Sequence, residues 1–517
     1  MFQLYDLYLL SPELSLTLLA LVVMMVDLFV KRRVVTVAVA LIGLIIPLAF
    51  SISLAVMIAN NTLVKNHAFF NMLVVDSYAV FFQIVFLIIA AVMILASYSY
   101  VGKYVKAEGE FYTLMLLSVT GMMLMASTGE LISIYISLEL TSIPLYVMAG
   151  LIRGSERSAE ASVKYVLLGA MSSAILLYGF ALLYGLTGTT DLKGIATAIA
   201  SGVQTGNLIV LVAAVLILAG FGFKISAVPF HMWAPDIYEG APTPSTAFFS
   251  VGSKAAGFAA LIRVFIDGGL GQVNLSSLVI AISIIAILSM SLGNVVAAVQ
   301  SNVKRMMAYS SIAQAGYILV GFVASLASTS HAGGGITGNA TGNAAVLFFI
   351  FVYVLTNLGA FSGIIALANA TGGEYIDDFR GLARRAPLLS AGTALCLLSL
   401  AGIPPMAGFI SKVFIFTAAW GQSQSLLAQG NSLLSGWLVA LVVIGLLNSV
   451  ISIVYYGRII KAMYFDAPPK PDHLTTPIGL SSTITLTTAA LIVITFAASL
   501  ILSLANPAAT SLLTFFR

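Results

Sequence analysis

Four lysines lie inside long apolar stretches of this 517-residue chain, where a charge is costly: Lys164, Lys224, Lys254 and Lys412. A lysine at the middle of a bilayer costs about 2.5–3.5 kcal/mol. The same stretches contain one central acid, Glu139, and a more peripheral one, Glu160. Burial disfavours the charged form of a lysine and a nearby carboxylate favours it, so such a set can take up and release protons. The pattern indicates transfer of a small ion across a bilayer, with protons as the expected cargo.

Two of these lysines lie beside expected breaks in their apolar stretches. The first stretch, GFGFKISAVPFHMWAPD (220–236), contains Lys224, and the second, LAGIPPMAGFISKVF (400–414), contains Lys412. Each contains two prolines: Pro229 and Pro235, then Pro404 and Pro405. Proline removes a backbone donor and clashes with the preceding turn, so both helices should break there. His231, after the first break, is a candidate proton relay or a donor to a backbone carbonyl.

The composition places the chain in a membrane. Hydrophobic residues make up 60% and charged residues only 8%, with a mean hydropathy of +1.06, whereas soluble domains carry about 25% charged residues. This excludes a soluble enzyme and a disordered chain, and a net charge of +4 gives no reason to expect a nucleic-acid partner. One cysteine and four histidines exclude an intrachain disulfide, a thiolate iron–sulfur site and a structural zinc site. Any redox electrons must therefore travel through another chain.

The elements that must position these residues are helices that span the bilayer. A span needs about 20 apolar residues, and the continuous apolar runs exclude a barrel of alternating strands. We therefore expect an all-α integral membrane protein with fourteen spans, near residues 7–30, 34–58, 76–101, 111–128, 130–151, 160–187, 206–238, 243–266, 275–299, 302–325, 344–368, 387–419, 434–465 and 477–504. The breaks fall in the seventh and twelfth spans, and this odd offset of five predicts two inverted five-helix repeats.

The basic residues predict the orientation. With the N-terminus outside, fifteen of the 23 lysines and arginines fall in cytoplasmic connections, four on the outer side (Arg263 among them) and four inside spans. This bias follows the positive-inside rule. The first span is followed by Lys31, Arg32 and Arg33 and reads as a retained anchor. We expect a multi-pass protein of the cell inner (plasma) membrane, with a thylakoid or another energy-coupling membrane as the alternative.

Several longer motifs resemble a known family. These are EASVKYVLLGAMSSAILLYGFALLYGLTGTTDL (160–192), FHMWAPDIYEGAPTPSTAFFSVGSKAAGFA (230–259), NVKRMMAYSSIAQAGY (302–317) and LAGIPPMAGFISKVF (400–414). In order and position they resemble the antiporter-like subunits of respiratory complex I (NADH–quinone oxidoreductase). They look most like the N type, which has counterparts in the mitochondrial and plastid forms of the complex. The L and M types and the subunits of multi-subunit cation/proton antiporters share the fold, but M-type chains usually carry Glu where this chain has Lys412.

The resemblance implies a proton-translocating subunit of a larger enzyme, with two half-channels. Glu139 matches the family's fifth-helix glutamate, and three lysines match its seventh-, eighth- and twelfth-helix residues: Lys224, Lys254 and Lys412. It implies no cofactor in this chain, with flavin, iron–sulfur clusters and quinone held by partner subunits, and partners among other antiporter-like and small membrane subunits. The expected division is 1–105 (three helices), 106–268 (first repeat), 269–466 (second repeat) and 467–517 (last helix).

Our hypothesis is that Lys224, biased by Glu139, loads from the cytoplasmic side and passes its proton through Lys254 to Lys412 for outward release. Lys164 and Glu160, four residues apart, could instead form a local pair near a helix end. Connecting water could be held by Ser226, Ser253, Ser310, Ser311, Gln314, Tyr317 and Asn357. Two other functions stay open: a subunit of a cation/proton antiporter, and a structural scaffold for redox subunits. The segment 333–338 matches a dinucleotide fingerprint literally, but without a preceding strand it reads as a loop.

Overall fold

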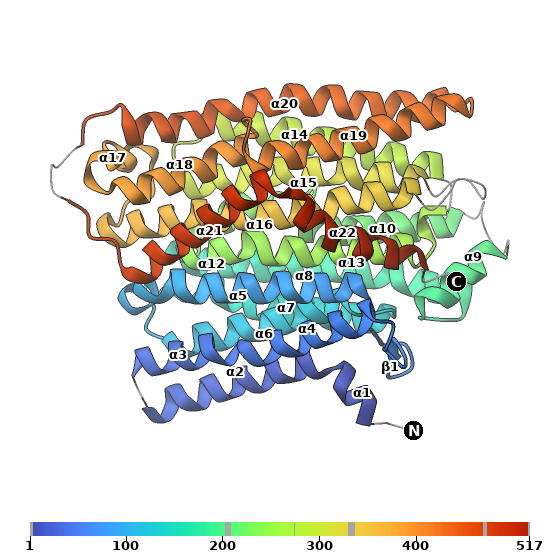
Figure 1. The fold of residues 1–517 in the computed structure, drawn as a ribbon, viewed down its shortest axis with the longest axis horizontal. Coiled ribbons are helices and arrows are strands. Elements are labelled where there is room, and N and C mark those ends of the chain that lie inside the picture. Colours follow the sequence, from blue (N-terminus) through green and yellow to red (C-terminus); the bar gives the residue numbers. More distant parts are fainter. Residues whose placement is uncertain are drawn as a thin grey trace.

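The protein is a bundle of long helices that run side by side (Figure 1). The structure is a computed structural model that describes residues 4–30, 32–201, 208–272, 275–328, 337–468 and 473–514. The segment 333–336 of the expected loop, and Lys31, His331, Lys470 and Arg517, therefore lie outside the described residues. The first and last described helices reach the same end of the bundle, which we call the terminal end. The other is the opposite end.

Thirteen described helices are long and apolar enough to cross a membrane. They are formed by α2 (Ser11–Val30), α3 (Arg33–Gly43) with α4 (Ile45–Ala59), α5 (Ser77–Tyr104), α6 (Glu108–Ala126), α7 (Leu131–Ala149), α8 (Glu156–Thr187), α10 (Leu208–Ile225), α12 (Thr243–Phe248) with a π-helical turn (Phe249–Ser253) and α13 (Lys254–Ile266), α14 (Leu275–Val299), α15 (Val303–Ser328), α16 (Thr337–Thr371), α20 (Ser432–Tyr464) and α21 (Ile478–Phe496). The one expected span not among these thirteen is the twelfth, which is formed by the broken pair α18 (Pro387–Ala401) and α19 (Ala407–Ala428). The prediction of an all-α membrane fold is confirmed.

Both predicted breaks are present. In the seventh span α10 ends at Ile225, and the short helix α11 (Trp233–Gly240) resumes after it. In the twelfth span α18 ends at Ala401 before Gly402, which has a φ of +81°. Glycine adopts this left-handed conformation without strain, and the prolines that follow cannot continue the helix. Each break therefore exposes backbone groups beside a lysine in the middle of a span.

Smaller elements complete the chain. The last expected span, 477–504, is not one helix, because α21 ends at Phe496 and α22 (Ala498–Thr514) follows after Ala497, which is not helical. The remaining elements are α1 (Leu4–Leu9), a hairpin of β1 (His67–Ala68) and β2 (Leu73–Val74), α9 (Leu192–Ala200), α17 (Leu382–Arg385) and two 3-10 turns, Leu270–Gln272 and Ile376–Phe379.

The core of the bundle consists of the eighth, tenth and eleventh spans. The apolar windows of Thr243–Ile266 and Val303–Ser328 are entirely buried, whereas only 28% of the window of α2 and 33% of those of α20 and α21 are buried. Exposed apolar side chains on the outer helices are what a bilayer would cover. The helices that carry Lys254 and its neighbours therefore lie where protein, and not lipid, surrounds them.

Candidate proton path

Lys224 lies in the last turn of α10, directly before the first break. Its side chain is buried, and its Nζ donates a hydrogen bond to the hydroxyl of Ser142 on α7. The ring of Tyr146, one turn further along α7, lies 5.7 Å from the same nitrogen. Ser142 in turn donates to the carbonyl of Leu138. The first lysine is thus held by a neutral hydroxyl that can be donor or acceptor.

Glu139 lies on α7 three residues before Ser142, on the same face of the helix. Its side chain is half-buried. Among the described residues, however, the contact of Lys224 is with Ser142, and Glu139 forms no ion pair with it. Glu139 and the hydrogen-bond partner of Lys224 therefore lie one turn apart on the same helix, and the influence of Glu139 on Lys224 stays a prediction.

Lys254 begins α13, directly after the π-helical turn Phe249–Ser253. Single π-helical turns inside helices occur frequently at functional sites. The side chain is buried, and Nζ donates to the hydroxyl of Ser311 on α15 at 2.6 Å. Within the described part of the chain, no carboxylate forms an ion pair with this lysine. Like Lys224, it is bonded to a neutral side chain in a buried site.

Lys412 lies on α19, just after the second break. Its Nζ donates to the carbonyl oxygen of Ala401, the last residue of α18, at 2.9 Å. The same nitrogen lies 4.6 Å from the centre of the Tyr317 ring, a cation–π distance. A cavity of about 10 Å³ borders Lys412, close to the smallest space that holds one water. The break therefore supplies a free carbonyl to the lysine, as expected of a discontinuous helix.

One face of α15 connects the surroundings of Lys254 and Lys412. Ser311 accepts from Lys254, and Gln314, one turn on, donates to the carbonyl of Leu400 beside the second break at 3.1 Å. Tyr317, one further turn on, lies under Lys412. Three of the polar residues expected to lie along the path thus share one helix face. Of the others, Ser310 bonds Tyr456, and Asn357 donates to Ser250 and to Tyr353. The Ser226 hydroxyl has no hydrogen-bond partner among the described residues.

Lys224 and Lys254 lie on adjoining helices. Gly257, one turn after Lys254, packs against Lys224 so closely that a Cβ at this glycine would lie 3.1 Å from the Cβ of Lys224. The described side chains do not complete a hydrogen-bonded chain between the two ammonium groups. Proton transfer between them would need a mobile hydroxyl or intervening water.

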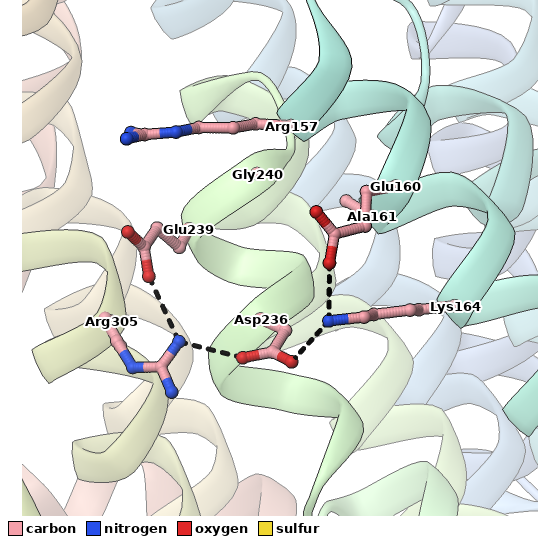
Figure 2. Close-up of a pocket in the computed structure, with 8 residues that line it drawn as sticks. All are labelled: Arg157, Glu160, Ala161, Lys164, Asp236, Glu239, Gly240 and Arg305. Carbon is pink, nitrogen blue, oxygen red and sulfur yellow. Dashed lines mark hydrogen bonds and ion pairs between the residues drawn. The ribbon is translucent and has the colours of Figure 1, made fainter.

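Lys164 differs from the other three lysines, because it lies at the opposite end of the bundle with a 41% exposed side chain. It pairs with Glu160 at 2.7 Å, which confirms the expected local pair, and with Asp236 of α11 at 2.9 Å. Figure 2 shows Arg305 completing this ion-pair cluster through Asp236 and Glu239, around a cavity of about 210 Å³. Sequence reasoning missed Asp236 and Glu239. Their spacing of three residues beside the first break was the available signal.

His231 lies in the first break with a buried side chain. Its Nδ1 has no hydrogen-bond partner among the residues that the structure describes. The surroundings of Nδ1 therefore favour neither of the two roles expected from the sequence, a proton relay or a donor to a backbone carbonyl.

Two buried polar sites were not expected. Glu13 in α2 is 2% exposed and accepts from Gln83 at 2.8 Å and Ser127 at 3.3 Å. Sequence reasoning missed it, since an acid in the first turn of a helix is ordinary. Arg263, which the sequence places on the outer side near a helix end, lies in the last turn of α13, fully buried and paired with Asp76 and Asp267. The sequence did not predict its burial, which these two acids make possible by pairing with the charge.

Comparisons of the sequence and of the fold with known proteins point to one family. The family model described as NADH:quinone oxidoreductase/Mrp antiporter, TM, matches residues 128–436. A protein of Desulfitobacterium hafniense named NADH-quinone oxidoreductase subunit N is 44% identical over 78% of this chain and 80% of its own length. One of the same name from Moorella thermoacetica is 45% identical over 77% of each chain.

Solved structures give the same result. A chain in the structure of respiratory complex I from Thermus thermophilus with bound aureothin matches with a TM-score of 0.73 and 30% identity, over 95% of this chain and 98% of that one. A chain of the Mrp complex from Dietzia sp. matches with a TM-score of 0.82 over the whole of both chains, but at 19% identity, so this second likeness shows the fold alone.

Proposed function

Because the chain belongs to the NADH:quinone oxidoreductase/Mrp antiporter transmembrane family, we propose that it is an antiporter-like, proton-translocating membrane subunit of a complex I-type NADH–quinone oxidoreductase. The chain is a multi-pass membrane protein. The enzyme's quinone reduction takes place in other subunits, which hold the flavin, the iron–sulfur clusters and the quinone. This chain carries no redox centre and supplies a route for protons.

The observation that carries the proposal is the state of three buried lysines. Lys224, Lys254 and Lys412 are each almost fully buried, and each donates to a neutral oxygen: Ser142, Ser311 and the Ala401 carbonyl. A buried ammonium group without an ion-paired carboxylate is poorly stabilised and gives up its proton readily. Three such groups in one bundle are costly for a scaffold and useful for proton transfer.

In the proposed mechanism, Lys224 takes up a proton from the opposite end of the bundle. Ionised Glu139 favours the charged form of Lys224, so that loss of this negative charge promotes release of the proton. The proton then passes to the neutral amine of Lys254, with the Ser311 hydroxyl orienting the receiving nitrogen. It continues along the face of α15 formed by Ser311 and Gln314 to the amine of Lys412. Each step moves one proton from an ammonium to an amine.

We propose an orientation in which the N-terminus and the terminal end face outside, so that protons travel from the cytoplasm outward. We propose the domain bounds expected from the sequence: three helices in 1–105, half-channels in 106–268 and 269–466, and a C-terminal segment in 467–517, which holds α21 and α22. Partners are the other antiporter-like and small membrane subunits of the complex in the inner (plasma) membrane or a related energy-coupling membrane.

The test is the variant Lys224→Ala in the assembled complex, reconstituted in vesicles. Proton uptake into the vesicles should fall several-fold per electron pair, while co-purification of the partner subunits stays normal. The matched control is Lys103→Ala, an exposed lysine that donates to a backbone carbonyl at 2.7 Å. Normal pumping by a stably assembled Lys224→Ala complex would sink the proposal.

The alternative is a subunit of a multi-subunit cation/proton antiporter, which the Dietzia fold likeness represents. A sodium site uses clustered oxygen ligands, whereas Lys254 and Lys412 on the proposed path are bonded to a neutral hydroxyl and a carbonyl. Recovery of the chain in mild detergent with cation-antiporter subunits alone would favour this alternative.

A further inference from the structure

Arg263 joins three helix ends at the terminal end of the bundle. Its Nε donates to the carbonyl of Ala126 at the end of α6 at 3.0 Å. Its Nη2 donates to Asp76 Oδ1 at 3.0 Å, and its Nη1 to Asp76 Oδ2 at 3.1 Å. The same Nη1 also donates to Asp267 Oδ2 at 3.1 Å. The guanidinium is fully buried and lies 4.9 Å from the ring of Tyr78.

A purely structural role accounts for Arg263 and Asp76. Asp76 is the N-cap of α5 and accepts from the backbone of Ala79 at 2.7 Å. Its two oxygens also receive a bidentate pair from Arg263, the geometry that stabilises a carboxylate best. The capped carbonyl of Ala126 adds a third helix end. These two residues form a complete ion pair that fixes α5, α6 and α13 together.

Asp267 is not explained by this role. It is fully buried, its Oδ2 shares an arginine nitrogen that is already bonded to Asp76, and its Oδ1 has no hydrogen-bond partner within the described residues. If both acids were ionised, one guanidinium would face two carboxylates in a site without solvent. Two like charges that share one site strongly favour one protonated acid. Asp267 has the fewer hydrogen bonds of the two acids, and it is therefore the one on which we place the proton.

A cavity at the terminal end of the bundle borders one residue of this cluster, Asp76. Asp76 and Ser77 border this cavity of about 570 Å³, whose rim includes His67 of β1 and Lys193 of α9. Asp267 directly follows α13, the helix that begins with Lys254. The pair of acids thus lies between the core of the first half-channel and a cavity at the terminal end. Both carboxylates bond the same Nη1, so one arginine nitrogen links the two acids.

We propose that Arg263, Asp76 and Asp267 form a second proton-release site, at the terminal end of the first half-channel, in addition to release from Lys412. Asp267 holds one proton as a carboxylic acid and loses it through Asp76 to the cavity. The cluster is then left with one uncompensated negative charge, which draws the next proton from the channel. The inference rests on the proposed function, because it assumes that protons cross this chain.

The test uses Asp267→Asn in the complete complex, with Asp377→Asn as the matched control at an exposed aspartate. Infrared spectroscopy detects the carbonyl band of a protonated carboxylic acid, separate from carboxylate bands. We expect Asp267→Asn to remove one such band and to lower protons pumped per electron pair several-fold, with partner co-purification unchanged. Asp377→Asn should change neither. An unchanged band and normal pumping in Asp267→Asn would overturn the inference.

Two further measurements keep the result interpretable. The variant Lys224→Ala is measured in parallel. If Lys224→Ala pumps normally, the proposed function fails; if Lys224→Ala loses pumping and Asp267→Asn does not, only the release site fails. Isotopic labelling of aspartate carboxyl groups in this chain, within an otherwise unlabelled complex, needs no substitution and covers a variant that does not assemble. An isotope shift of the carboxylic-acid band supports a protonated aspartate in this chain. A spectrum in which the label shifts no acid band overturns the inference.

Discussion

Replacing Gly402 by alanine should disable proton transfer through Lys412 without dismantling the fold. Gly402 follows α18 at the second break, with a φ of +81°. A Cβ placed there would lie 2.9 Å from Cδ and 3.0 Å from Nζ of Lys412. Both distances are shorter than an ordinary contact, so the lysine end must move away. The same nitrogen is bonded to the Ala401 carbonyl, one residue before the glycine.

The magnitude has two separate parts. The left-handed backbone conformation costs a residue with a Cβ about 1–2 kcal/mol, which appears as lost stability. Displacement of Nζ weakens a hydrogen bond of a charged group, worth up to about 1.5–3 kcal/mol. Because 1.36 kcal/mol is a factor of ten, the equilibrium for holding a proton at Lys412 should change by roughly ten- to a hundred-fold. The number of protons pumped per electron pair should therefore fall by a larger factor than the loss of stability alone would cause.

Gly430→Ala is the matched control. Gly430 has the same φ of +81°, but a Cβ there would meet nothing within 4 Å. Both variants should lose similar stability, measured by thermal inactivation of the assembled complex. Only Gly402→Ala should lose protons pumped per electron pair in reconstituted vesicles. The reasoning is refuted if Gly402→Ala pumps like wild type, or if Gly430→Ala loses pumping to the same degree.

Two predictions concern the contacts of Lys254 and of the ion-pair cluster. Ser311→Ala removes the hydroxyl that Lys254 bonds at 2.6 Å and should slow pumping about tenfold or more. The control is Ser283→Ala, because the hydroxyl of Ser283 donates to a carbonyl of its own helix, and this variant should pump at the wild-type rate. Equal pumping rates in the two variants would contradict the role of Ser311. Arg305→Gln breaks two ion pairs of a 31% exposed side chain and should cost about 1 kcal/mol or less in thermal stability. Loss of assembly in this variant would show that the cluster holds α11 in place.

The sequence is sufficient to predict what depends on local composition. Apolar runs longer than the bilayer needs predict the fourteen spans, and Pro229 and Pro404–Pro405 predict where two of them break. The lysines are conspicuous because charge is scarce around them. Each of these inferences uses residues within one helix length of one another, which is why the structure agrees with them.

The sequence does not predict which helices become neighbours. Ser311 was only one of several polar residues that could line a path, and its contact with Lys254 depends on α15 crossing α13. The burial of Arg263 could not be predicted because its partner Asp76 lies 187 residues away. For Lys164 the sequence indicated the local pair with Glu160 but not the pair with Asp236, which lies 72 residues away. Long-range partners decide the environment of a charge, and no local pattern contains them.

Ser311, Gln314 and Tyr317 place Lys254 and Lys412 against a single rigid helix, and this has a thermodynamic consequence. If the protonation state of Lys254 shifts α15 and thereby changes the proton affinity of Lys412, then Lys412 must change the proton affinity of Lys254 by the same factor. The two sites are reciprocal, so neither acts only as sender or receiver. A proton retained at Lys412 would therefore change the proton affinity of Lys254. A proton gradient of opposite sign across the bundle would drive the same transfers in the reverse direction.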